Sequence, residues 1–437
     1  MSNEVLALVM LGALLVMVIG GVRLAFAMMF LAVVFGFMFR GQAILSLFMQ
    51  SIWGVMQNEV LIAVPLFVLM GSLLTKSGAA DRLFNAMYEL FGTVRGGLAL
   101  TTVLISTLFA AGTGIIAASV TTMALMALPV MLRKGYDHGL ATGVVCAGGT
   151  LGILIPPSVM LIILGPMAGV SVSRLFAGAL GPGLLLALCY LIYVGVKCWL
   201  WPSAGPAMSP EERTKSTGRL LKDAALYLLP VIGLLVAVLG SILIGIATPT
   251  EASAVGVIGA AIIAGIYRSL TWPALRDAVY DTVQVTSMVF FVVVGAAMFT
   301  AVFLFMGGGR LIGSFLFEMD ISKWAILALI MLAVFILGMV LDWIGVLFII
   351  VPIFTPIATQ LGFDPLFFTL IVAVNLQMSF LTPPFAYAIF FTKGVAPPEV
   401  KTTSIYRGVL PFVALQALVL LACIVYPDLL LWLPGRL

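Results

Sequence analysis

The stretch Gly149-Thr150-Leu151-Gly152-Ile153-Leu154-Ile155-Pro156-Pro157-Ser158 decides the fold of this chain, because a double proline interrupts an apolar run there. Proline lacks an amide donor and its ring clashes with the preceding helical turn, so a helix that enters this stretch must break. The pattern returns 227 residues later in Ser379-Phe380-Leu381-Thr382-Pro383-Pro384, and the same offset pairs Pro129 with Pro356. Broken helices at matching positions of two halves are typical of a transporter's binding site.

The composition places most of the chain in lipid. Of its 437 residues, 63% are hydrophobic and only 9% are charged, and the mean hydropathy is +1.25. Such a chain cannot cover itself with a polar surface, so we expect an all-α, polytopic membrane protein. The net charge of +4 is small and lies in loops, which argues against a nucleic-acid partner. The four cysteines lack metal-ligand spacing and are interpreted as small core residues.

A long uncharged run in the first half predicts a re-entrant hairpin. Residues 96–132 carry no charge, which is too long for one span and too short for two spans with a loop. Division at Gly112-Thr113-Gly114 gives two helices of about 14 residues, each about 20 Å long. We therefore expect a hairpin at residues 98–130 that enters the membrane and returns to the same side.

The second half repeats this run. Between Lys323 and Asp364 the only charge is Asp342, so a second hairpin is expected at residues 324–357. Irregular backbone at such depth is tolerated only inside protein or beside a water-filled cavity. The fold class is therefore an inverted repeat with two hairpins and two broken helices.

The remaining apolar segments are interpreted as ordinary spans and surface helices. A span needs about 20 apolar residues. The expected spans are near 4–20, 24–39, 44–74, 174–200, 224–245, 248–267, 283–306 and 405–433. Amphipathic segments at 75–97 and 272–281 are expected to lie along the membrane surface.

Basic loops give the expected orientation. The loop at 202–223 carries four basic residues between 213 and 222, so the positive-inside rule places it in the cytoplasm. Counting crossings from this loop also places the basic segments 133–134, 268–276 and 393–401 in the cytoplasm. The two halves are then inverted, both termini face outward, and the hairpin tips converge near the middle of the bilayer.

Each break and hairpin tip leaves main-chain groups unpaired, which suits ion binding. The carbonyl groups of Gly152, Ile155 and Pro156, with the hydroxyl of Thr113, could hold one sodium ion. The matching set in the other half is Gly338, Ser379, Thr382 and Phe385. The alternative is that these residues are only hinges, formed by Pro156, Pro157, Pro383 and Pro384, together with tight glycine contacts. Packing alone does not require paired breaks in inverted halves, which favours the ion sites.

The substrate path is expected to contain Asn375, Asp342 and Gly114. Asp342 is the only carboxylate deep in the hairpin runs, which makes it a functional candidate. It also precedes a helix and could be its N-cap, and the two roles are compatible. No arginine or lysine is expected in the core, so a carboxylate would meet helix N-termini and amide donors such as Asn375. Glu251 is interpreted as a capping acid.

These residues carry a resemblance to a known family. The run from Lys134 to Ser158, followed by Gly169-Val170-Ser171, resembles the large membrane subunit (M subunit) of tripartite ATP-independent periplasmic (TRAP) transporters. Residues 248–252, 338–342 and 381–384 are similar to its other signatures, so nearly the whole chain is covered. One departure concerns the first hairpin tip, which is serine-rich in the family and here reads Ala110-Ala111-Gly112-Thr113-Gly114-Ile115-Ile116. This leaves the side-chain ligands of the first sodium site open and favours a more apolar chamber.

The resemblance implies a sodium-driven importer of organic acids with an elevator mechanism. Its partners would be a small four-helix membrane subunit and a soluble periplasmic binding protein that delivers the substrate and mostly determines its identity. The location would be the bacterial inner membrane. Sodium is the coupling ion, and no other cofactor is expected.

The expected elevator mechanism divides the chain into scaffold and transport parts. The expected parts are 1–97 (scaffold helices and surface arm), 98–170 (hairpin 98–130 and broken helix 139–165), 171–284 (scaffold spans, loop 202–223 and second arm), 285–393 (hairpin 324–357 and broken helix 366–392) and 394–437 (final span).

Three alternatives stay open at this point. A stand-alone sodium or proton dicarboxylate symporter is also built from inverted hairpin repeats. An ion channel fits less well, because a proline-broken midplane suits alternating access. A membrane enzyme would need a nucleophile and a base, and the sequence offers no such pair.

Overall fold

A computed structural model describes residues 3–114, 116–208 and 217–437 of the chain. Within these ranges every regular element is a helix, and ten helical segments are long and apolar enough to cross a membrane. The prediction of an all-α, polytopic membrane protein is therefore confirmed.

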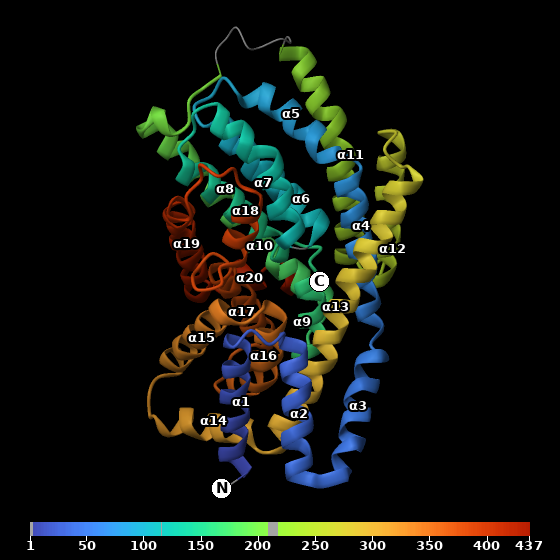
Figure 1. Ribbon diagram of the computed structural model, residues 1–437, viewed down its shortest axis with the longest axis vertical. Coiled ribbons are helices and arrows are strands. Elements are labelled where there is room, and N and C mark those ends of the chain that lie inside the picture. The colour runs from blue at the N-terminus through green and yellow to red at the C-terminus, as the bar shows by residue number, and fades with distance from the viewer. Residues whose placement is uncertain (1–2, 115, 209–216) are drawn as a thin grey trace.

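The helices repeat in the same order in the two halves (Figure 1). The first half consists of α1 Asn3–Ile19, α2 Leu24–Arg40, α3 Ile44–Met56, α4 Ala63–Lys76, α5 Ala79–Phe91, α6 Gly97–Thr113, α7 Ile116–Arg133, α8 His138–Thr150, α9 Val159–Ala168 and α10 Val172–Leu200. The second consists of α11 Thr217–Leu243, α12 Pro249–Ile266, α13 Trp272–Phe305, α14 Gly308–Glu318, α15 Lys323–Val340, α16 Trp343–Gln360, α17 Pro365–Ser379, α18 Tyr387–Val395 and α19 Thr402–Val425, followed by the short α20 Asp428–Leu431. Helix α16 begins 227 residues after α7 begins and ends 227 residues after α7 ends.

Both predicted broken helices are confirmed. Helix α8 ends at Thr150, a 3-10 turn spans Leu151–Ile153, and α9 begins after the first proline pair. Helix α17 ends at Ser379 and α18 begins after the second pair. The peptide bond within each proline pair is cis.

Both predicted hairpins are also confirmed. Helices α6 and α7 meet at Gly114, whose φ of +61° suits glycine, while α15 and α16 meet at residues 341–342. In Figure 1 the α6–α7 pair comes from the upper part of the molecule and the α15–α16 pair from the lower part, with both tips toward the centre. Helix α9 packs on α16, and its counterpart α18 packs on α7, so each broken helix reaches the other half's hairpin.

The expected third span at 44–74 is wrong as a single helix. It consists of α3 and α4, separated by the 3-10 turn Glu59–Ile62. Asn58 starts this turn, because its side-chain oxygen accepts a hydrogen bond from the amide of Val60 at 3.1 Å. An asparagine that captures a nearby amide competes with the continuing helix.

The expected separate segments at 272–281 and 283–306 are also wrong. They form the single 34-residue helix α13, which is capped by the Thr271 hydroxyl. No proline follows Pro273 within this helix, so the polar residues at 276–284 lie on one of its faces without ending it. The amphipathic helix of the second half is instead α14, the counterpart of α5.

Small residues hold the helices close together. A Cβ atom added at Gly143 would clash with the carbonyl oxygen of Gly408, so the backbones of α8 and α19 touch there. Close backbone approach at glycine is a principal source of packing energy between membrane helices. Helices of the two halves also pack on each other in the scaffold: α4 packs on α12, and α13 packs on α2.

Candidate functional site

The second break gathers the four residues predicted for its sodium site. A Cβ atom added at Gly338 would lie 2.5 Å from Ser379 Oγ, so α15 and α17 are in direct contact here. The Phe385 amide donates to the carbonyl of Met339 at 3.2 Å, and the Thr382 amide donates to the carbonyl of Ser379 at 3.3 Å. The break therefore wraps around the end of α15, although its use as a sodium site stays a prediction.

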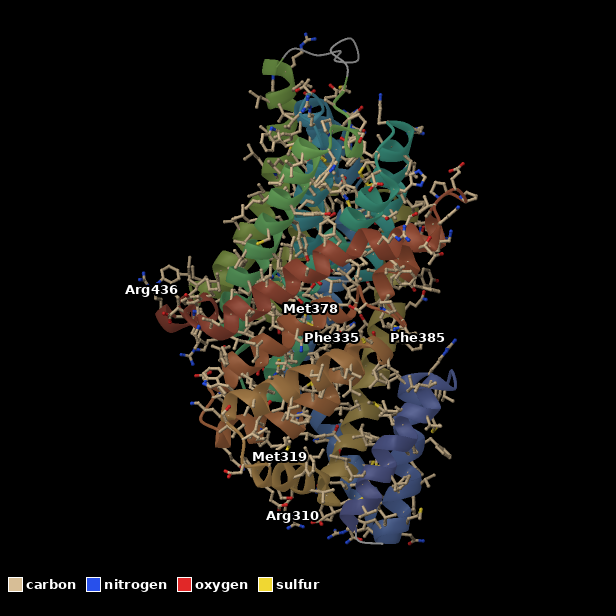
Figure 2. All side chains as sticks on the ribbon, turned by 90° about the vertical axis from the view of Figure 1, so that its left-hand side faces the viewer. Arg310, Met319, Phe335, Met378, Phe385 and Arg436 are labelled. Atoms are coloured by element: carbon tan, nitrogen blue, oxygen red, sulfur yellow. The ribbon has the colours of Figure 1, made fainter. Side chains whose placement is uncertain are left out.

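A ladder of hydrogen bonds fixes α17 to α15. Asn375 Nδ2 donates to the carbonyl of Met331 at 2.6 Å, and one turn later Ser379 Oγ donates to the carbonyl of Phe335 at 3.3 Å. Figure 2 shows Phe335 near the middle of the molecule's long axis. The amide group of Asn375, expected in the substrate path, therefore bonds hairpin backbone in this structure.

The first break presents free main-chain oxygens. Within the described residues no hydrogen bond reaches the carbonyl oxygens of Gly152, Ile155 and Pro156. Gly114 approaches this break, because a Cβ atom added there would lie 3.3 Å from the amide nitrogen of Val159. The predicted residues of the first half are thus assembled around one hairpin tip.

The hydroxyl of Thr113 has a partner that sequence reasoning missed. Thr113 Oγ1 and Ser119 Oγ lie 2.6 Å apart, and both residues are buried. Their spacing of six residues spans the hairpin turn, so helical periodicity gives no sign of this contact. Ser119 therefore supplies a second hydroxyl beside Thr113, at a hairpin tip that lacks the serines of the family pattern.

The two breaks differ in exposure. Pro156 and Pro157 are buried, whereas Pro383 and Pro384 are exposed. The side chain of Phe385 is also exposed, with a relative accessibility of 45%. The proline pair and Phe385 of the second half are thus exposed, while Gly338 and Ser379 beside them are buried, and the proline pair of the first half is covered.

Two acidic residues occupy helix N-termini, as the sequence indicated. Asp342 is the half-buried N-cap residue of α16, but its side chain forms no capping hydrogen bond there. Its position at the start of the helix is confirmed, and a functional role stays a prediction. Glu251 forms a capping box with Thr248, in which Glu251 Oε2 accepts from the Thr248 amide at 2.8 Å. Glu251 thus stabilises the start of α12.

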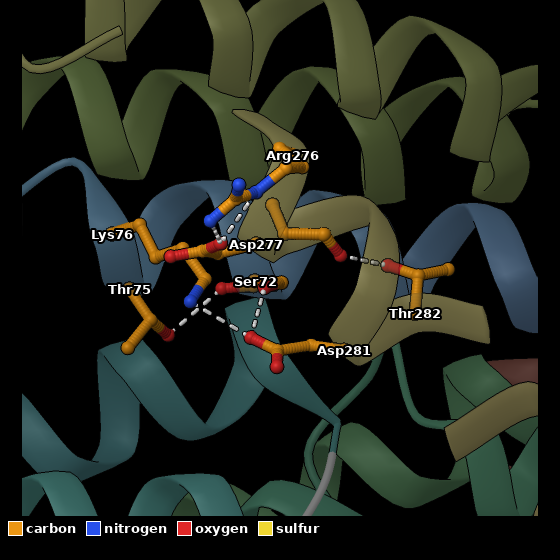
Figure 3. A network of polar contacts seen from close by, with 9 residues as sticks. Ser72, Thr75, Lys76, Arg276, Asp277, Asp281 and Thr282 are labelled. Atoms are coloured by element: carbon orange, nitrogen blue, oxygen red, sulfur yellow. Dashed lines mark hydrogen bonds and ion pairs between the residues drawn. The ribbon is translucent and has the colours of Figure 1, made fainter. Parts of the chain in front are cut away.

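A mostly apolar pocket of about 310 Å³ adjoins the first hairpin, and an ion pair lies in its wall. Figure 3 shows the polar contacts around this ion pair. Its lining comes from α4, α13 and the hairpin tip and includes Thr113, Lys76 and Asp281. Lys76 Nζ forms an ion pair with Asp281 Oδ2 at 2.9 Å. The side chain of Lys76 is 29% exposed, so this residue lies at the edge of the core, beside the hairpin tip, and not inside the core.

Inverted halves, opposed hairpins and paired helix breaks define a membrane transport protein with internal repeats. The family described as "Tripartite ATP-independent periplasmic transporter, DctM component" matches residues 11–429, and the chain belongs to this family. It is a multi-pass inner-membrane protein and a transporter permease subunit, not an enzyme.

Named relatives transport different compounds. The C4-dicarboxylate TRAP transporter large permease protein DctM of Pseudomonas aeruginosa is 32% identical over 384 residues, which cover 87% of each chain. The sialic acid TRAP transporter large permease protein SiaM of Vibrio cholerae is 29% identical over 416 residues, covering 95% of each.

A solved structure shares the fold. The YdaH transporter of Alcanivorax borkumensis matches with a TM-score of 0.65 and 15% identity, over 96% of this chain and 99% of that one. This similarity supports the arrangement of helices.

Proposed function

We propose that this chain is the sodium-coupled membrane subunit of an importer for an organic acid. The observation that carries the proposal is the pair of helix breaks beside two opposed hairpin tips. Unwound backbone near the bilayer midplane, with carbonyl oxygens directed at a cation, is the recurring arrangement in sodium-driven transporters.

The residues at both breaks suit a sodium ion. Hydroxyl and carbonyl oxygens are hard, neutral donors, and the first break offers the unbonded carbonyls of Gly152, Ile155 and Pro156 beside Thr113. The second break offers the backbone around Gly338 and Ser379 with the hydroxyl of Thr382. Bound sodium supplies positive charge at each tip, where it would attract an acid travelling with it.

Bare polar groups on α17 support a polar ligand beside the second break. Gln377 is fully buried, and within the described residues neither of its amide atoms has a hydrogen-bond partner. The side-chain oxygen of Asn375 is also buried and also has no hydrogen-bond partner within the described residues. Buried polar atoms without partners are costly, so their presence in one helix favours a site that water, ions or substrate complete.

An elevator movement is the proposed mechanism. In this proposal the hairpins and broken helices move together against α4 and α13. The first hairpin packs closely against α4 at Gly71, since a Cβ atom added to Gly71 would lie 2.6 Å from Thr113 Cα. Because glycine has no side chain, the hairpin can pack tightly against α4 here and can still slide past it.

The family supplies the proposed partners and the class of substrate. The family description names a tripartite, periplasmic system, so we propose a soluble periplasmic binding protein and a small four-helix membrane subunit as the other two parts. The similar relatives are named for different acids, which supports the class of organic acids and leaves the compound to the binding protein. With the basic loops in the cytoplasm, both termini would be periplasmic.

Reconstitution of the complete complex tests this function. Proteoliposomes with an inward sodium gradient and added binding protein should take up the cognate acid, and dissipation of the gradient should abolish uptake. Equal uptake without sodium would refute sodium coupling. Uptake by this chain alone, without its partners, would instead identify a stand-alone symporter.

A further inference from the structure

The pocket between α4, α13 and the first hairpin is mostly apolar with a few polar groups, which is the usual composition of a ligand site. Its volume of about 310 Å³ falls at the lower end of the range for small-molecule sites, which is roughly 300–1,000 Å³. Its walls are mostly small or apolar, and the charged pair lies beside the polar side chains of Ser72, Thr75 and Gln284. The small and apolar lining residues are Val68, Gly71, Ala117, Ala118 and Val285. The pocket therefore combines a cation, hydrogen-bond donors and space.

The cation is held by a weak and replaceable partner. The side chains of Lys76 and Asp281 are 29% and 54% exposed, and Asp281 also accepts a hydrogen bond from Ser72 Oγ at 3.3 Å (Figure 3). Ion pairs with this exposure contribute little net stability, because solvent competes for both charges. A second carboxylate can therefore replace Asp281 beside Lys76 at small cost.

Donors for that second carboxylate are already in place. Gln284 lies one helical turn beyond Asp281 on α13, and within the described residues its exposed amide has no hydrogen-bond partner. Ser72 lies one turn before Lys76 on α4. The two helices come from different halves of the chain, so the pocket exists only in the folded repeat pair.

The position of the pocket connects it to the proposed transport route. Thr113, at the tip of the first hairpin, forms part of its wall, and Gly71 allows the tip to touch α4. A solute that leaves the first hairpin on this side would meet Lys76 directly.

We propose that this pocket is a transient carboxylate site on the scaffold, in which Lys76, Ser72 and Gln284 bind the transported acid and Asp281 displaces it. The proposal rests on the function proposed above and adds the scaffold residues that receive the acid. Asp281 acts as an internal competitor, which keeps the site weak enough for release.

Carboxylate binding in this pocket can be distinguished from a purely structural role of the ion pair between Lys76 and Asp281. If the ion pair only clamps α4 to α13, removal of either charge weakens the same contact, and the charge-reversed pair Lys76→Asp with Asp281→Lys restores it. If the pocket binds carboxylate, the two single variants act in opposite directions. Lys76→Gln removes the cation, whereas Asp281→Asn removes the competitor.

Equilibrium binding of radiolabelled succinate and sialic acid to the purified membrane subunits, without the binding protein that would itself bind the acid, tests this difference. We expect Lys76→Gln to weaken binding about tenfold, as for loss of a charged hydrogen bond, and Asp281→Asn to tighten it about two- to fivefold. The matched control is Asp277→Asn, which removes the neighbouring ion pair between Arg276 and Asp277 outside the pocket and should leave binding unchanged.

Two outcomes overturn the proposal. They are equal weakening by both single variants and the absence of saturable binding of either acid to the wild-type membrane subunits. Sodium-driven uptake in proteoliposomes is measured separately, so the proposed function can stand when this site fails.

Discussion

The contact between Gly338 and Ser379 gives the most direct test of the second site. In Gly338→Ala the added Cβ would lie 2.7 Å from Ser379 Cβ and 2.5 Å from Ser379 Oγ. Carbon atoms prefer separations of about 3.5–4.0 Å, so α17 must move away from α15 by roughly 0.8 Å or more. Neither atom belongs to a long flexible side chain that could turn aside.

The cost follows from three effects. Overpacking of this kind costs about 1–3 kcal/mol. The hydrogen bond from Ser379 to Phe335, already 3.3 Å long, would be lost at about 1 kcal/mol. Alanine returns about 1 kcal/mol through its higher helix propensity. We therefore expect a net destabilisation of about 1–3 kcal/mol, together with weaker sodium dependence of uptake.

Denaturant titration of the purified complex measures the stability, and sodium titration of uptake measures the coupling. Gly12→Ala in α1 is the matched control, because nothing lies within 4 Å of the added atom, and it should be neutral or slightly stabilising. A Gly338→Ala protein with wild-type stability and wild-type sodium dependence would refute the close contact on which the second site depends.

Three further predictions follow from single contacts. Thr382→Ala should raise the sodium concentration needed for half-maximal uptake, while Thr382→Ser should keep the wild-type value; equal values for all three proteins would exclude the hydroxyl as a ligand. Tyr136→Phe should destabilise the protein by about 1–3 kcal/mol, because the Leu98 amide donates to the Tyr136 hydroxyl at 3.2 Å. Burial raises the pKa of this phenol, so it is protonated at neutral pH and the loss, measured by thermal unfolding, should be the same at pH 6 and pH 8. Thr248→Ala should cost about 0.5–2 kcal/mol by removing the cap that it forms with Glu251, and an unchanged unfolding midpoint would show that this cap contributes nothing.

The breaks and hairpins could be predicted because their causes are local. Proline pairs end helices wherever they occur, and an uncharged run of fixed length restricts how often it can cross a bilayer. The continuous α13 could not be predicted this way. Its polar face near Asp281 has the pattern of a surface helix, and only packing in the folded chain shows that the same helix continues to Phe305.

The site was only partly predictable for a related reason. Residues near a proline pair are adjacent in sequence, so Gly152 and Pro156 could be named together. The partners of Lys76 and Asn375 lie on other helices, and no periodic signal joins residues that are 205 or 44 positions apart. Such contacts depend on how helices from different halves are placed against each other.

The unequal exposure of the two proline pairs has a consequence for the other end of the transport cycle. The two halves share one arrangement of helices, yet the proline pair of the first half is buried and that of the second half is exposed at the protein surface. We therefore expect the two halves to exchange conformations in the opposite transport state, so that the first half takes the conformation that the second half has here, and the reverse. In the opposite state, water-soluble reagents should reach position 157 and lose access to position 384.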